Sequence, residues 1–153
     1  MRQRTLAREC ALKIIYWLDI GRCGLDEAWD GFWQCYEAGL DKPSREFSKI
    51  LVCGVSENLK DIDAKIEGLA ANWDIGRMAV VERNILRMAA FEILFLPDIP
   101  RKVSINEAID LAKKYGDRDS GKFVNGILDK INTEDALRLR PSVNSGLCSG
   151  QKR

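Results

Sequence analysis

Residues 104–128 read SINEAIDLAKKYGDRDSGKFVNGIL, a pattern that predicts two helices joined by a short polar turn. Ser104 and Glu107 fit a capping box at the start of the first helix. Gly116 is expected to end that helix, because glycine takes positive φ without steric cost. Apolar residues at helical spacing then predict two buried stripes. They are Ala108, Ile109, Leu111, Ala112 and Tyr115 in the first helix, and Phe123, Val124, Ile127, Leu128 and Ile131 in the second.

A polar cluster lies where the second helix begins, and it includes one aromatic ring. Its members are Asp119, Ser120, Lys122, Phe123 and Asn125. Asp117, Asp119 and Ser120 can also cap the second helix. A carboxylate, a basic group, an amide and a ring are the side-chain types that recognise single-stranded nucleic acid. The same residues also suit an ordinary corner between two helices, so both interpretations stay open.

Helical periodicity extends over most of the remaining chain, and no stretch alternates with a period of two. We therefore predict an all-α fold with three helical stretches on each side of residues 71–77. This gives one domain over residues 1–131, with subdomains at 1–72 and 76–131. An aromatic stripe at Trp29, Phe32, Trp33 and Tyr36 is more typical of a core than of a site. Periodicity fades after Ile131, and the polar residues 132–153 are predicted to be a disordered tail.

The charged residues are unevenly distributed, although the 153-residue chain has a net charge of only +1. Residues 1–22 carry five basic and two acidic groups, and residues 101–130 carry seven and five. Residues 23–100 carry eight basic and fourteen acidic groups. Basic ends that meet in the fold would form one positive face, whereas an acidic middle would repel RNA and attract a basic protein. Uneven charge on a small helical protein can also arise by chance.

Several classes of function are disfavoured by what the sequence lacks. Histidine is absent, and the five cysteines are widely spaced without a CxxC pair, which argues against a metal site and a Cys–His nucleophile. No glycine-rich cofactor loop or P-loop occurs, so we expect no cofactor and no enzymatic activity. The cysteine pattern fits a reducing cytoplasm. We expect no signal peptide and no membrane span.

The first helical stretch, residues 3–22, carries a second group of candidate contacts. Arg4 and Arg8 lie one turn apart on one flank, and Tyr16 lies on the polar side. Arginines can contact phosphates, and an exposed tyrosine can stack on a base. The alternatives are that the two arginines form a solvated basic flank and that the tyrosine ring packs at the edge of the core.

Four segments carry a resemblance to a known family. They are Glu-Arg-Asn-Ile-Leu-Arg-Met-Ala-Ala-Phe-Glu-Ile at 82–93, the residues 104–116 quoted above, Asp-Ser-Gly-Lys-Phe-Val-Asn-Gly-Ile-Leu-Asp-Lys at 119–130, and Arg-Glu-Cys-Ala-Leu at 8–12. Together with Tyr16, they resemble the bacterial transcription antitermination factor family NusB. The resemblance covers residues 2–131 and is weakest over residues 23–75. The same fold also occurs fused to some ribosomal RNA methyltransferases, but this chain has no room for their catalytic domain.

The resemblance implies two packed three-helix bundles and a function in transcription. A protein of this family binds the boxA element of nascent RNA jointly with NusE, a ribosomal protein. The pair joins other Nus factors on RNA polymerase and suppresses premature termination, notably of ribosomal RNA transcripts. The sequence does not set the oligomeric state and is compatible with a homodimer.

The resemblance also implies a set of site residues. By position, the RNA contacts are Arg4, Arg8, Tyr16, Arg87, Asp119, Ser120, Lys122, Phe123 and Asn125. Glu82 occupies a position at or near the junction of NusE and RNA. The basic residues near the N-terminus are sparse, which predicts a smaller electrostatic contribution to RNA binding.

Three alternative classes remain to be weighed against this function. A protein–protein scaffold would bind the ribosomal protein, or itself, without a contribution from RNA. An enzyme fragment, such as a detached methyltransferase domain, is disfavoured by the missing motifs. A helix–turn–helix DNA binder is disfavoured because no predicted helix has a dense run of groove-reading side chains.

Overall fold

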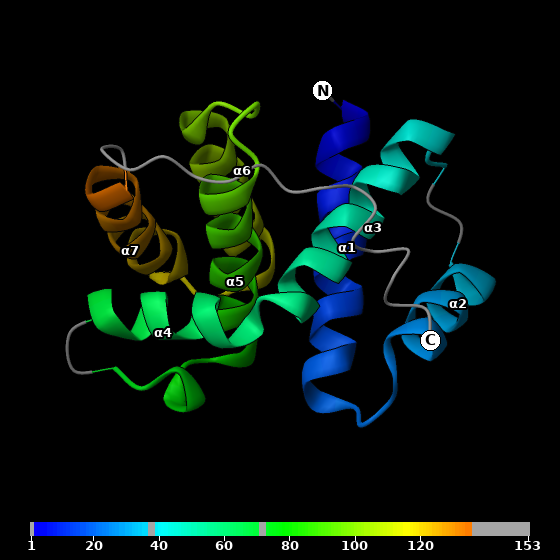
Figure 1. Ribbon diagram of the computed structural model, residues 1–153, viewed down its shortest axis with the longest axis horizontal. Coiled ribbons are helices and arrows are strands. Elements are labelled where there is room, and N and C mark those ends of the chain that lie inside the picture. Colours follow the sequence, from blue (N-terminus) through cyan, green and yellow to red (C-terminus); the bar gives the residue numbers. More distant parts are fainter. Residues whose placement is uncertain (1, 37–38, 71–72, 136–153) are drawn as a thin grey trace. The chain divides into compact units, whose positions relative to one another are not determined.

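The computed structural model describes residues 2–36, 39–70 and 73–135 (Figure 1). These residues form helices and connections, and none of them lies in a strand, which confirms the predicted all-α class. The elements in chain order are α1 (Arg2–Ile20), α2 (Leu25–Cys35), α3 (Lys42–Glu57), α4 (Leu59–Leu69), the short 3-10 helix η1 (Ile75–Arg77), α5 (Val80–Phe95), α6 (Arg101–Tyr115) and α7 (Ser120–Asp135).

The described residues divide into two compact units between Glu57 and Asn58. The first unit contains α1–α3, and the second contains α4–α7. Sequence periodicity predicts the division at residues 71–77, and the difference lies in the unit to which α4 belongs. Its Ile62 and Ile66 are fully buried, and the helix contacts α5 and α7. Apolar periodicity continues from α3 into α4, so it does not reveal that the two helices pack in different units.

In the first unit, α1 packs against both α2 and α3. Four small or branched residues of α1 are completely buried: Ala7, Cys10, Ala11 and Ile14. The buried Ser48 hydroxyl of α3 donates a hydrogen bond to the Ala7 carbonyl (2.6 Å), which satisfies a polar group inside this core. Asp41 caps α3 by accepting a hydrogen bond from the Ser44 amide (2.9 Å), and the hydrogen bonds from Ser44 lower the pKa of Asp41.

In the second unit, α5 is the central element and contacts α4, α6 and α7. Every residue from Asn84 to Leu94 is buried. The predicted start of α6 at Ser104 is wrong, because the helix begins at Arg101 after Pro100. Ser104 lies inside the helix, where its hydroxyl donates to the buried Glu92 carboxylate (2.7 Å). A buried carboxylate needs such a donor, and the proline already defines the helix start.

Gly116 ends α6 as predicted, but its φ is −101° rather than positive. Position 116 requires glycine for a steric reason. A Cβ at this position would lie 2.5 Å from the Ser120 Oγ and 2.8 Å from the Ala112 carbonyl oxygen. The chain therefore turns tightly from α6 into α7 only because residue 116 has no side chain.

At its other end, α7 extends to Asp135, beyond the predicted limit at Ile131. Arg101 of α6 donates to the Asn132 carbonyl (3.1 Å) and so ties this extension to the start of α6. Of the predicted tail, residues 136–153 lie outside the described residues. In the described part of the chain, no helix is long and apolar enough to cross a membrane.

Candidate nucleic-acid interface

The turn between α6 and α7 is held by the hydroxyl of Ser120. This side chain is 1% exposed, accepts a hydrogen bond from the Asp117 amide (2.8 Å) and donates one to Glu82 Oε2 (2.5 Å). Since Glu82 lies on α5, the contact fastens the turn to the central helix of the unit. Ser120 was predicted to contact RNA, but the structure gives its side chain a buried, internal role.

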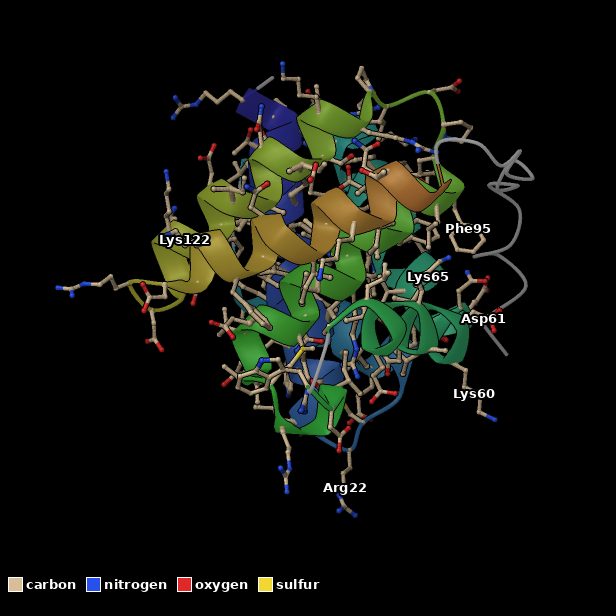
Figure 2. All side chains as sticks on the ribbon, turned by 90° about the vertical axis from the view of Figure 1, so that its left-hand side faces the viewer. Arg22, Lys60, Asp61, Lys65, Phe95 and Lys122 are labelled. Atoms are coloured by element: carbon tan, nitrogen blue, oxygen red, sulfur yellow. The ribbon has the colours of Figure 1, made fainter. Side chains whose placement is uncertain are left out.

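Three of the predicted RNA residues lie exposed at the same end of α7: Asp119, Lys122 and Asn125. The Asp119 carbonyl accepts from the Phe123 amide (3.1 Å), so Asp119 directly precedes the first turn of the helix. Figure 2 shows Lys122 at this end of α7, next to the turn. A carboxylate, an ammonium group and an amide thus reach solvent together at the start of one helix.

Phe123 lies beside these polar groups and contacts Trp73, which was not among the predicted site residues. Its ring is half-buried, and its centroid lies 5.8 Å from that of Trp73, with the two planes inclined at 69°. Trp73 is 50% exposed. The sequence predicts residues 71–77 to be a connection, although a tryptophan in a polar connection is itself a signal of a contact or site. The pair adds an exposed indole to the aromatic surface beside the turn.

Arg87 does not fit the predicted phosphate contact. Arg87 is 8% exposed, and its guanidinium forms a bidentate pair with Asp63, at 2.8 Å from Nε to Oδ1 and 2.9 Å from Nη2 to Oδ2. Nη1 also donates to Asn84 Oδ1 (3.0 Å). This pair joins α5 to α4 within the second unit, so the structure assigns Arg87 a role in packing.

In the first unit, Arg4 and Arg8 both lie over the ring of Phe47. The Arg4 guanidinium is 4.0 Å from the ring centroid and Arg4 is exposed, whereas Arg8 is 5.2 Å away and only 3% exposed. A guanidinium stacked on a ring keeps its edge available for hydrogen bonds. Arg4 can therefore still meet a phosphate, while Arg8 is a buried part of the unit. Tyr16 is partly exposed on α1.

Basic side chains also cover the aromatic stripe of α2. Lys13 lies over Tyr36 (4.7 Å), Arg45 over Trp33 (4.3 Å) and Lys49 over Trp29 (5.7 Å). Phe32 is buried between Trp33 and Tyr36. This agrees with the interpretation of the stripe as packing, and cations from α1 and α3 shield its outer rings.

The shifted pKa values do not coincide with the exposed cluster on α7. Burial raises the pKa of the Cys10 thiol to about 11, which keeps it neutral and unreactive at physiological pH. Burial also raises the pKa of Glu57. Within the described residues, no group of three or more Cys, Asp or Glu side chains could hold a metal ion. The exposed groups at the start of α7 can bind through charge, hydrogen bonds and stacking. Such features define the class: an all-helical protein with a polar and aromatic surface suited to nucleic acid.

Comparison with known proteins identifies the family. A model of the NusB family matches residues 5–133, and the chain belongs to this family. The transcription antitermination protein NusB of Syntrophus aciditrophicus is 49% identical over 131 residues, which cover 86% of this chain and 80% of that protein.

Solved structures give the same result. The NusB structure from T. maritima aligns with a TM-score of 0.78 and 39% identity, covering 86% of this chain and 91% of that one. A structure titled as the antitermination factors NusB and NusE in complex with dsRNA aligns with a TM-score of 0.78 and 32% identity. It covers 88% of this chain and 98% of that one.

Proposed function

We propose that this chain is a transcription antitermination factor that binds boxA RNA together with the ribosomal protein NusE. In this role it joins other Nus factors on RNA polymerase and prevents premature termination, notably of ribosomal RNA transcripts. The observation that carries the proposal is the exposed group of Asp119, Lys122 and Asn125 beside the Phe123 ring, within residues that match the NusB family.

The chemistry of this group suits single-stranded RNA. Lys122 supplies a positive charge for a phosphate, and Asp119 and Asn125 supply hydrogen-bonding groups for base edges. Phe123 supplies a partly exposed ring on which a base can stack. In the first unit, Arg4 and Tyr16 are the accessible candidates for further contacts. Arg8, Arg87 and Ser120 are buried. They would therefore contribute to RNA binding indirectly, by holding the shape of the units that present the exposed residues.

Glu82 is the proposed contact with NusE. It is partly exposed and accepts a hydrogen bond from Ser120, so it lies directly behind the turn that carries the RNA candidates. The solved complex of NusB and NusE with RNA supports a joint mode of binding for this chain. We further propose that the protein acts in the cytoplasm, by binding and not by catalysis.

A scaffold that binds NusE alone is the second candidate function. It is favoured by the three predicted RNA residues whose side chains are engaged inside the units, since each reduces the surface available to RNA. The two functions differ in one measurable respect. A scaffold forms a complex with NusE whose stability does not change when boxA RNA is added.

The test is a competition experiment with labelled boxA RNA and a scrambled RNA of equal length and composition, each with and without NusE. We expect a preference for boxA that increases when NusE is present. Equal binding of the two RNAs in the presence of NusE would refute the proposal. A complex with NusE on gel filtration that RNA neither strengthens nor alters would establish the scaffold instead.

A further inference from the structure

Gly126 lies in the interior of α7, and the packing of the fold does not explain it. It is exposed, and a Cβ at this position would have no described heavy atom within 4 Å. The nearby Gly121 differs, since a Cβ there would touch Lys113 and Ile109 of α6 at 3.5 and 3.6 Å. Glycine weakens an exposed helix interior, and it is used where backbone must approach a ligand closely.

The flank of α7 that carries Gly126 also carries Phe123 and Lys130. At 100° per residue, these three positions fall within about 60° of one another around the helix. Lys130 Nζ donates to the carbonyl of Leu69 at the end of α4 (3.3 Å). Phe123 contacts Trp73, which follows α4 in the chain. Both contacts place this flank beside the end of α4 and the segment after it. We call Trp73, Phe123, Gly126 and Lys130 the Trp73 strip.

The composition of the Trp73 strip points to one kind of occupant. Two rings meet edge to face with the indole half exposed, and bare backbone lies one helical turn along from Phe123. Lys122 and Lys130 border or belong to the strip, and the carboxylates of Asp74, Asp119 and Asp129 lie around it. Two rings, exposed backbone and the ammonium groups of two lysines together suit a nucleotide, whose base stacks on an aromatic face while its phosphate binds a cation.

We propose that Trp73 and Gly126 form a stacking subsite for one nucleotide of single-stranded RNA, beyond the contacts of Asp119, Lys122 and Asn125. The base stacks on the Trp73 indole, and the sugar–phosphate backbone passes over Gly126, where a methyl group would keep it away. The inference rests on the proposed function, because it extends the RNA that is bound with NusE.

The test uses the full chain with NusE and single-stranded boxA RNA that carries 2-aminopurine at one position at a time. We expect the fluorescence of one position to be quenched on binding. Trp73→Ala should relieve that quenching and lower the affinity roughly 5- to 100-fold, the range expected for loss of one stacked base. Trp73→Phe should retain part of both effects, since a smaller ring still stacks.

Gly126→Ala tests whether RNA backbone passes close to this glycine. Both the melting temperature and the RNA affinity of the variant are measured. We expect a higher melting temperature, because alanine favours the helix, together with weaker RNA binding. Gly68→Ala is the matched control, since Gly68 is an exposed glycine of α4 whose Cβ would likewise have open space. It should raise the melting temperature without a change in affinity.

The outcomes separate this subsite from the function on which it rests. If wild-type protein binds boxA selectively while Trp73→Ala and Gly126→Ala bind equally well, the subsite is wrong and the function stands. If Trp73→Ala weakens the complex with NusE in the absence of RNA, the strip serves a protein and the subsite is again wrong. If wild-type protein shows no preference for boxA, both proposals fail.

Discussion

Two neighbouring residues of the α6–α7 turn have opposite environments. Asp119 is exposed, whereas Ser120 is buried with both hydrogen-bonding capacities of its hydroxyl used by Asp117 and Glu82. The family resemblance implied the same RNA-binding role for both. The structure divides the roles, since an exposed carboxylate can meet a base while a buried hydroxyl shapes the turn that presents it.

Asp119→Asn and Ser120→Ala should therefore separate binding from stability. Asn caps helices as well as Asp does, so Asp119→Asn should leave the unfolding free energy within about 0.5 kcal/mol and change RNA binding. Ser120→Ala leaves the Asp117 amide and the Glu82 carboxylate without this partner, and should destabilise the fold by about 1–3 kcal/mol. Urea unfolding and RNA titration of both variants measure this. Equal losses of stability and binding in Asp119→Asn would contradict a direct contact.

Arg87→Ala should behave as a packing mutation. Removing Arg87 from this bidentate, partly buried pair leaves the 21% exposed Asp63 side chain without its partner, at a cost of about 1.5–3 kcal/mol in unfolding free energy. Arg87→Lys should recover only part of the loss, because an ammonium group cannot form the two parallel hydrogen bonds. Thermal unfolding of both variants gives the measurement. A large drop in RNA affinity with unchanged stability would restore Arg87 as an RNA contact.

The sequence pointed to candidate RNA contacts, but it did not distinguish those that are exposed in the fold from those that are buried. Helical spacing places a residue on a face of its own helix, but it does not show what another helix offers to that face. Arg87 meets Asp63, which lies 24 positions earlier in the chain, and Arg8 meets Phe47 of α3. The contact between Trp73 and Phe123 is of the same kind, because the two rings are distant in sequence, although a tryptophan in a polar connection already marks the position.

Among the elements, the α6–α7 hairpin was the best predicted. The two helices, the short turn and the stop at Gly116 all agree with the structure. The error at the start of α6 arose because Ser104 and Glu107 match a capping pattern, while the buried carboxylate that binds Ser104 belongs to α5. Local patterns therefore located the helices, and contacts between helices decided the roles of their polar residues.

Gly116→Ala tests the tightness of this turn. A methyl group at residue 116 would collide with the Ser120 side chain and with the Ala112 carbonyl. The turn must then open, and we expect a loss of about 1–3 kcal/mol in unfolding free energy. Gly68→Ala serves as the control that introduces a methyl group into open space. Unchanged stability in Gly116→Ala, measured by urea unfolding, would show that the turn has room to relax.

At the scale of the whole molecule, composition and periodicity predicted the all-α class and disfavoured catalytic and metal-dependent functions. They did not place the division of the chain, because the apolar stripe of residues 47–69 is continuous although α3 and α4 belong to different units. The function was predicted from the family resemblance, because no single residue pattern predicts it alone. The exposed end of α7 supplies the physical reason why that function suits this chain.

The most direct test of this account is the salt dependence of boxA RNA binding in the presence of NusE, for wild-type protein, Lys122→Ala and Lys60→Ala. Lys60 is an exposed lysine of the same unit, on α4 (Figure 2). Loss of one phosphate contact should lower the slope of log affinity against log salt by about 0.7. We predict that decrease, with weaker binding, for Lys122→Ala and a wild-type slope for Lys60→Ala. Wild-type slopes and affinities for both variants would contradict an RNA interface at the α6–α7 turn.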